Sequence, residues 1–243
     1  MKKRFFWTAL FLIAVVQTNM AQIEKDIIKT NQGDLEIWFV GHGSLIFGFK
    51  GQTIHVDPYS KLADYTTLPK ADLILITHEH GDHLDQSAIA AIRKPDTRLV
   101  TNPSAGEVLN EGTVMKNNES ITMVGLTIES VPAYNIVHMR SENSPFHPKG
   151  VGNGYIISFG NVRVYIAGDT EDIPEMAHIK NIDVAFLPMN LPYTMTPQMV
   201  AKAAKTFNPK ILYPYHFGKT NTNELIDLLK DEKDIEVRIR KME

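Results

Sequence analysis

Short apolar runs separated by polar turns recur along the chain, and many of them are rich in β-branched or aromatic residues. Runs of this kind, bounded by glycine, proline or asparagine, predict strands. In the first half of the chain the predicted strands are residues 35–40, 45–49, 53–56, 72–76, 98–101, 121–124 and 126–131. In the second half they are residues 155–159, 162–166, 183–187, 211–213 and 235–239.

Helical periodicity appears between some of these strands. Residues 84–93 bring four apolar side chains to one face, namely Leu84, Ala88, Ile89 and Ile92. Further helices are predicted at residues 104–110, 172–178, 196–207 and 222–230. Ser104 and Thr196 are the expected N-terminal caps of two of them.

Strands followed by a mixture of strands and helices, twice over, predict an α/β fold with two packed sheets and helices outside them. The length of 243 residues and the 43% apolar content suit one large domain with a full core. Residues 133–152 interrupt the pattern, because they show little periodicity. An irregular segment of this length within a compact domain is usually functional, so we expect it to contribute to a site.

The N-terminus has a different pattern. Lys2, Lys3 and Arg4 precede an apolar run at residues 5–16, and a polar stretch follows up to Ala21. This arrangement is typical of a secretory signal peptide, and the apolar run is short for a membrane span. We therefore predict a signal peptide at residues 1–21, a mature domain at residues 22–243 and a periplasmic or secreted protein without a stable membrane span after cleavage. An uncleaved tether is the alternative.

Charge and cysteine content narrow the classes of function. Residues 1–21 carry three cations and no anions, so their removal takes the net charge from −3 to −6. A mildly acidic protein without a basic stripe is not expected to bind nucleic acid. The chain has no cysteine, which excludes disulfides, thiolate ligands and a cysteine nucleophile.

The strongest chemical signal is the stretch Thr77-His78-Glu79-His80-Gly81-Asp82-His83, directly after the predicted strand at residues 72–76. It places four potential metal ligands within six residues, namely His78, His80, Asp82 and His83. Imidazole and carboxylate together suit zinc, manganese or iron. A catalytic zinc takes about three protein ligands and a water, so four ligands already exceed one such ion.

The motif His-x-His-x-Asp-His after an apolar strand resembles that of the metallo-β-lactamase superfamily. The resemblance extends from about residue 35 to residue 243 and includes Val131-Pro132-Ala133-Tyr134, Ala167-Gly168-Asp169-Thr170 and Tyr213-Pro214-Tyr215-His216. Within it, Gly41-His42-Gly43-Ser44, Asp57-Pro58 and Tyr193-Thr194-Met195-Thr196 resemble the branch that contains ascorbate-6-phosphate lactonase. The resemblance implies a single-domain, four-layer αββα sandwich with a binuclear metal site at one rim.

The resemblance also implies the remaining ligands. Asp169 would bridge the two metals, and His216 would complete the second ligand set. The chain departs from the family where a histidine usually follows the Pro–small pair, since Asn135 stands near that place. We expect His147 to replace it; His138, or a site with only two histidines, is the alternative. Asn135 would then support a ligand or orient the substrate.

Two turn residues nearer the N-terminus are further candidates. Asp57 is expected to steady the motif loop, with a plain Asp-Pro turn as the alternative. His42 could hydrogen-bond the substrate or a ligand, and a structural role is an equal alternative. Asp82 or a metal-bound water could carry the proton during the reaction.

The predicted activity is hydrolysis assisted by two divalent ions, most readily zinc, with manganese or iron as alternatives. A hydroxide bridging the ions would cleave an ester, lactone or phosphodiester-type bond, and a β-lactam is an alternative substrate. A non-catalytic metal-binding protein and a diiron redox protein are the competing functions. We expect a small-molecule substrate, anionic if Arg140, Lys149 or Lys61 lines the site. A homo-oligomer is compatible with the sequence.

Overall fold

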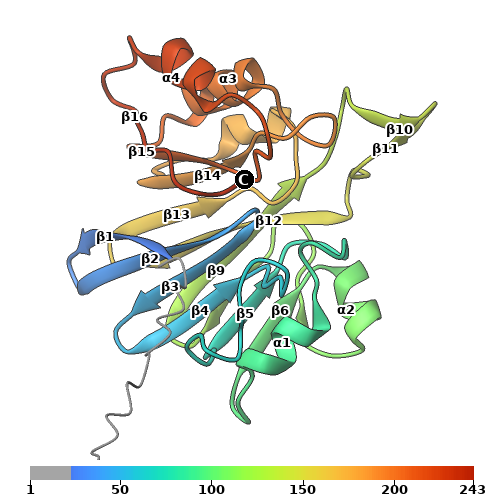
Figure 1. Cartoon of the computed structure of the whole chain (residues 1–243), viewed down its shortest axis with the longest axis vertical. Helices are drawn as coiled ribbons and strands as arrows, with labels where there is room; N and C mark the ends of the chain where they lie inside the picture. Colours follow the sequence, from blue (N-terminus) through green and yellow to red (C-terminus); the bar gives the residue numbers. More distant parts are fainter. Residues whose placement is uncertain (1–22) are drawn as a thin grey trace, which may run out of the picture.

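Two seven-stranded sheets form the centre of the molecule in the computed structural model, which describes residues 23–243 (Figure 1). The first sheet contains, in order, β1 (Glu24–Thr30), β2 (Gly33–Gly41), β3 (Ser44–Phe49), β4 (Gln52–Val56), β5 (Leu73–Ile76), β6 (Arg98–Thr101) and β7 (Thr113–Val114). Strands β1 to β4 pair antiparallel, and β4 to β7 pair parallel.

The second sheet has the order β16-β15-β14-β13-β12-β9-β8. Its strands are β8 (Ser120–Met123), β9 (Leu126–Ala133), β12 (Gly152–Phe159), β13 (Val162–Ile166), β14 (Val184–Pro188), β15 (Ile211–Tyr215) and β16 (Glu236–Val237). Strands β8, β9, β12 and β13 pair antiparallel, and β13, β14, β15 and β16 pair parallel. A small hairpin of β10 (Met139–Ser141) and β11 (Ser144–Pro145) projects from the body (Figure 1).

Helices cover the outer faces of both sheets. The first sheet carries α1 (Gln86–Ile92) and α2 (Pro103–Leu109), whereas the second carries α3 (Pro197–Phe207), α4 (Thr222–Leu229) and the 3₁₀ helix η1 (Pro174–His178) (Figure 1). The predicted α/β fold, a four-layer αββα sandwich, is therefore confirmed.

Strand β5 shows why the apolar pattern was readable. Leu73 and Leu75 belong to the core between the sheets, whereas Ile74 and Ile76 pack with α1 and α2 in a second apolar cluster. A strand buried on both faces is apolar at every position, unlike an antiparallel strand with one solvated face. The strand that delivers the histidine motif is thus held from both sides.

Several local predictions differ from the structure. The predicted helix at residues 172–178 is the short 3₁₀ helix η1, strand β7 was not predicted, and Leu84 lies before the start of α1. Strand β1 was missed, because its sequence Glu-Lys-Asp-Ile-Ile-Lys-Thr has charged residues on an edge strand. The predicted cap at Ser104 is wrong, because Asn102 caps α2 by accepting a hydrogen bond from the Ala105 amide. The segment at residues 133–152 is not wholly irregular, since it contains the β10–β11 hairpin.

The predicted signal peptide, residues 1–21, lies outside the described residues. Among residues 23–243, none of the helices combines the length and the apolar character needed to cross a membrane.

Candidate metal centre

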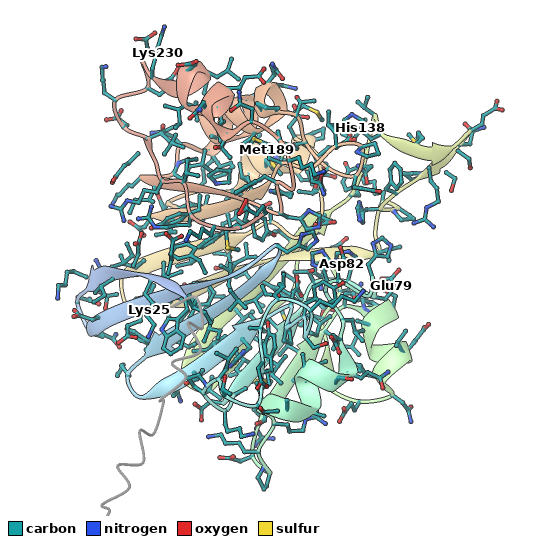
Figure 2. All side chains as sticks on the ribbon, viewed as in Figure 1. Lys25, Glu79, Asp82, His138, Met189 and Lys230 are labelled. Carbon is teal, nitrogen blue, oxygen red and sulfur yellow. The ribbon has the colours of Figure 1, made fainter. Side chains whose placement is uncertain are left out.

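Chain segments from both sheets bring the predicted ligands to one edge of the sandwich. The motif loop, residues 77–83, follows β5, while Asp169 and His216 follow β13 and β15. The two sheets are joined at this edge, because the Asn153 amide donates to the Thr77 carbonyl at 3.0 Å. Figure 2 shows Asp82 and Glu79 at this edge, between the two sheets.

The seven predicted ligands and His42 form one cluster in three overlapping groups, within each of which the potential ligand atoms lie within 4.8 Å of one another. The groups are His78, His80 and His147; His42, Asp82, His83 and His216; and His78, His83 and Asp169. His80 and Asp82, close in sequence, thus fall in different groups. Each of the three groups could hold a metal ion, and how many ions the motif loop serves stays a prediction.

Asp169 lies close to histidines from all three groups. Its Oδ2 is 3.3 Å from His147 Nε2 and 3.4 Å from His216 Nε2, and its Oδ1 is 3.5 Å from His83 Nε2. Two ligands bound about 2.1 Å from one tetrahedral ion are about 3.4 Å apart. The spacing therefore fits a carboxylate that binds a metal ion together with a neighbouring histidine.

The unpaired polar atoms of the cluster also fit metal ions. His78 Nε2, His83 Nε2, His216 Nε2 and Asp169 Oδ1 are buried and have no hydrogen-bond partner among residues 23–243. A buried polar atom without a partner costs free energy, so several at one place indicate a ligand. All four are atoms that bind zinc or manganese, and the residues present fit divalent metal ions.

Asp57 orients two of the histidines. It is fully buried and accepts hydrogen bonds from the Thr77 amide at 2.8 Å, Thr77 Oγ1 at 2.6 Å and His83 Nδ1 at 2.8 Å. Because Thr77 Oγ1 donates to Asp57, it accepts from His78 Nδ1 at 2.9 Å. Both imidazoles thus donate a hydrogen bond from Nδ1 and direct Nε2 toward the cluster. Asp57 contacts the motif loop as expected, and Thr77 is a link that the sequence did not reveal.

Asn135 orients His147 in the same way. Its Oδ1 accepts from His147 Nδ1 at 2.6 Å and from the His147 amide at 2.8 Å. Its Nδ2 donates to Glu171 Oε1 at 3.0 Å and to the Tyr193 carbonyl at 2.9 Å. Asn135 is buried, so this contact favours support of a ligand over contact with substrate.

Glu171 is the other residue that the sequence did not single out. Its fully buried carboxylate accepts three successive amides, those of Ile136, Val137 and His138, at 2.6 to 2.7 Å. His138 Nδ1 also lies 2.6 Å from Glu171 Oε1, which turns His138 toward Glu171. His147 rather than His138 therefore lies in the cluster. In the sequence, the only signal for Glu171 is its position two residues after Asp169.

Burial and charge set the protonation states in the cluster. Burial alone would raise the pKa of the Asp169 carboxyl, but the nearby His216 and His83 hold this pKa well below its ordinary value. Burial lowers the pKa of His78 well below its ordinary value, and the charge of His83 adds to this effect. An ionised carboxylate and a neutral imidazole are the forms that bind metal.

The turns of the site have unusual backbones. His42, Asp57 and His216 have φ values of 48°, 45° and 47°, in the left-handed region that non-glycine residues rarely adopt. The His216 amide donates to the His42 carbonyl at 2.9 Å, which joins turns from the two sheets. At Gly43 a Cβ would lie 2.8 Å from His83 Cε1, so only glycine lets the ring approach. Such conformations concentrate at functional sites.

His42 contacts two of the predicted ligands, Asp82 and His216. Its Nε2 lies 3.0 Å from Asp82 Oδ2, and its ring lies 3.7 Å from the His216 ring, measured between centroids. Both contacts fit the expectation that His42 hydrogen-bonds a ligand. His42 also lines the cleft, so contact with substrate stays a prediction.

The cluster forms the floor of a cleft of about 550 Å³. His42, Asp82, His147, Asp169 and His216 line it at the bottom. Its walls come from the second half of the chain, namely Arg140, Phe146, Asn190 and Tyr193. The volume suits a small molecule.

Comparisons with known proteins agree with this geometry. A family model described as "Beta-lactamase superfamily domain" matches residues 36–216. A "UPF0173 metal-dependent hydrolase" of Thermococcus kodakarensis is 32% identical over 198 residues, which cover 76% of this chain and 85% of the relative.

Two solved structures resemble the whole fold. A candidate metal-dependent hydrolase from Parabacteroides distasonis is 53% identical, with a TM-score of 0.88, and the match covers 91% of this chain and 100% of that one. Igni18, a metallo hydrolase from Ignicoccus hospitalis, is 25% identical, with a TM-score of 0.72 and coverage of 85% and 95%. The likeness to the ascorbate-6-phosphate lactonase branch stays a prediction. The chain belongs to the beta-lactamase superfamily and is a metal-dependent hydrolase.

Proposed function

We propose that this hydrolase uses two divalent ions to cleave an ester, lactone or phosphodiester-type bond in a small molecule. The observation that carries the proposal is Asp169, whose carboxylate lies 3.3 to 3.5 Å from histidine nitrogens of both ligand sets. A single ion would leave unpaired either His78 Nε2 or the Nε2 atoms of His83 and His216, all of which are buried.

The residues divide into two proposed ligand sets. His78, His80 and His147 would hold one ion, while Asp82, His83 and His216 would hold the other, with Asp169 shared by both. Two bound ions would supply a water deprotonated near neutral pH and would polarise the oxygen of the scissile group. Zinc is the preferred metal, with manganese or iron as alternatives.

The side chains around the sets have supporting tasks. Asp57, Thr77 and Asn135 keep the histidine Nε2 atoms directed at the ions through the hydrogen bonds at Nδ1. Asp82, with 38% of its side chain exposed, faces the cleft and is the proposed proton acceptor, held by His42. Hydrolysis adds hydroxyl to the acyl carbon or phosphorus and a proton to the leaving oxygen, so one such acceptor and donor suffices.

The predicted signal peptide at residues 1–21 determines where we expect this reaction to occur. A cleaved N-terminal signal would place the enzyme in the periplasm or outside the cell, where a β-lactam is an alternative substrate. No feature of the cleft favours a β-lactam over the other three bond types.

Metal content and turnover test the proposal together. The purified protein, loaded with zinc or manganese, should contain two ions per chain by elemental analysis. It should hydrolyse at least one of 4-nitrophenyl butyrate, γ-octalactone and bis(4-nitrophenyl) phosphate, and chelator should abolish that activity. Nitrocefin tests the β-lactam alternative.

A matched pair of variants tests the ligand sets. His147→Gln should lower the metal content by about one ion and the activity by two orders of magnitude or more, about 3 kcal/mol. His138→Gln should keep both ions. One ion in the parent protein, with no turnover on any substrate, would instead support a non-catalytic metal-binding protein.

A further inference from the structure

The walls of the cleft contain one cation that no acidic side chain neutralises. Arg140 lies on β10 with its guanidinium 5.9 Å from the centre of the Phe146 ring, and it forms no ion pair in the part of the chain that the structure describes. The other two basic residues considered, Lys149 and Lys61, do not line the cleft. Lys149 Nζ is paired with Glu175 at 2.8 Å, and Lys61 lies over the Tyr59 ring outside the cleft. An unpaired guanidinium facing a cleft is suited to a carboxylate or phosphate.

Exposed apolar side chains are frequent in the two chain segments that supply the cleft residues Arg140, Asn190 and Tyr193. Of the ten large apolar residues that are exposed within residues 23–243, five come from two short segments, residues 136–139 and 191–193. These five, called the apolar rim, are Ile136 (45% exposed), Val137 (66%), Met139 (42%), Leu191 (46%) and Tyr193 (45%). Single exposed apolar residues are ordinary, whereas a group beside a binding cleft marks a surface that a ligand covers.

The two segments of the rim are held together and to the cleft. Asn135 Nδ2 donates to the Tyr193 carbonyl at 2.9 Å, and the Phe146 and Tyr193 rings meet edge to face with centroids 5.0 Å apart. Glu171 fixes the backbone of Ile136 and Val137 through their amides. The apolar side chains at these positions therefore stay exposed on a fixed backbone. Figure 2 shows His138 beside the projecting β10–β11 hairpin, on the same side of the molecule as Asp82.

We propose that the substrate is an amphiphilic anion. Its carboxylate or phosphate binds Arg140, and an apolar chain or ring beside that group lies across the apolar rim. The bond to be hydrolysed then faces the ligand cluster at the floor of the cleft. This assignment rests on the proposed function for the cleavage step, but the binding of an amphiphilic anion can be measured without turnover.

Binding is tested by calorimetry on the metal-loaded protein with four probes: octanoate, butyrate, octyl phosphate and 1-octanol. Octanoate should bind more tightly than butyrate and 1-octanol, and the comparison with octyl phosphate shows which anion is preferred. Arg140→Gln should weaken octanoate binding about tenfold, because a charged hydrogen bond is lost. Val137→Ser should weaken it about threefold, because apolar surface is lost.

Two control variants carry the same substitutions elsewhere. Arg98→Gln changes an exposed arginine on β6, and Val108→Ser changes a valine of α2 that is 53% exposed. Neither residue belongs to a chain segment that supplies the cleft residues, so octanoate affinity should stay within about twofold of the parent value. Equal losses in the control and rim variants would overturn the proposal, as would an Arg140→Gln protein that binds octanoate as the parent does.

Turnover gives a second, separable measurement. The 4-nitrophenyl esters of butyric, octanoic, succinic and suberic acid differ only in chain length and in a terminal carboxylate. The ratio of kcat/KM for the suberate ester to that for the octanoate ester should exceed one and fall about tenfold in Arg140→Gln. If no ester is hydrolysed but octanoate binding still depends on Arg140, the proposed reaction fails and the ligand class stands. If hydrolysis occurs with no preference for chain length or charge, the ligand class is wrong.

A membrane surface is the competing use of the rim. Cosedimentation with phosphatidylglycerol vesicles distinguishes the two. Vesicle binding that Val137→Ser abolishes, with octanoate affinity unchanged, would overturn the assignment to substrate.

Discussion

The two halves of the candidate metal centre are built in different ways. The motif loop at residues 77–83 supplies four proposed ligands from one short stretch, and it is held by a fully buried carboxylate, that of Asp57. Residues 133–152, here called the cleft segment, supply one proposed ligand, His147, which a neutral amide, that of Asn135, holds on a stretch whose middle part, residues 136–143, is largely exposed.

The difference suggests a division of tasks. The motif loop is fixed by β5, which is buried on both faces, so its geometry tolerates little change. The cleft segment also carries Arg140 and most of the apolar rim, and its exposed part, residues 136–143, can vary without disturbing the core. Chemistry would thus be set by the first region and substrate choice by the second. The following four predictions test this comparison, from the largest effect to the smallest.

Metal removal should affect both regions. At a metal concentration a thousandfold above Kd, binding stabilises the folded state by about 4 kcal/mol per site, so chelator should lower the thermal midpoint by about 10 °C or more. Hydrogen exchange should then increase in the motif loop and around His147 together. Faster exchange in only one of the two regions would show that a single ion is bound.

Among substitutions near the site, Asp57→Asn should lower folding stability the most. It replaces a buried acceptor of three hydrogen bonds and leaves His83 Nδ1 facing an amide, which should cost about 3 kcal/mol of folding stability. Metal affinity should also fall tenfold or more. Urea unfolding and chelator competition measure the two effects. A variant that keeps parental metal affinity would show that Asp57 is only a turn residue.

Glu171→Gln should affect the cleft segment alone. The amide nitrogen of glutamine cannot accept the backbone hydrogen bonds that both carboxylate oxygens accept, so stability should fall by about 2 kcal/mol. Metal affinity at the His147 set should weaken, because Asn135 loses its partner. Exchange in residues 77–83 should stay at the parental rate. Loosening of the motif loop as well would contradict the division into two regions.

Asp26→Asn is a control remote from both regions. Burial raises the pKa of the Asp26 carboxyl, but hydrogen bonds from Tyr213 and Arg240 outweigh this and hold the pKa below its ordinary value of 3.8. These contacts join β1 to β15 and to the C-terminal segment, and the substitution should cost about 1 kcal/mol at pH 7. Metal content and activity should be unchanged.

The pH dependence of that control follows from the direction of the shift. Because the folded pKa lies below the unfolded value, the stabilisation is fully present above pH 3.8 and is lost as the pH falls through the lower folded pKa. The difference between parent and Asp26→Asn in urea unfolding should therefore shrink on acidification from pH 5 to pH 3. A difference that grows over this range would show that another group is responsible.

Much of the fold was readable from the residues because burial leaves a periodic trace. The all-apolar β5 and the Thr196–Pro197 start of α3 appeared where expected. Strand β1 escaped because a polar edge strand takes its stability from pairing with β2, and pairing leaves no apolar pattern. Asn102 displaced Ser104 as a cap because both residue types suit the position and only the local backbone chose between them.

By itself the sequence determined the family, the αββα sandwich, the hydrolase assignment and the local group of ligands at residues 78–83, because neighbours in a chain stay neighbours in space. The tertiary structure alone decided that His147 and not His138 enters the cluster, and that Glu171 and Thr77 support it. It also showed that Arg140 lines the cleft, whereas Lys149 and Lys61 do not. Hydrogen bonds between loops more than thirty residues apart, such as that between His138 and Glu171, make these choices, and no spacing within one stretch of sequence encodes them.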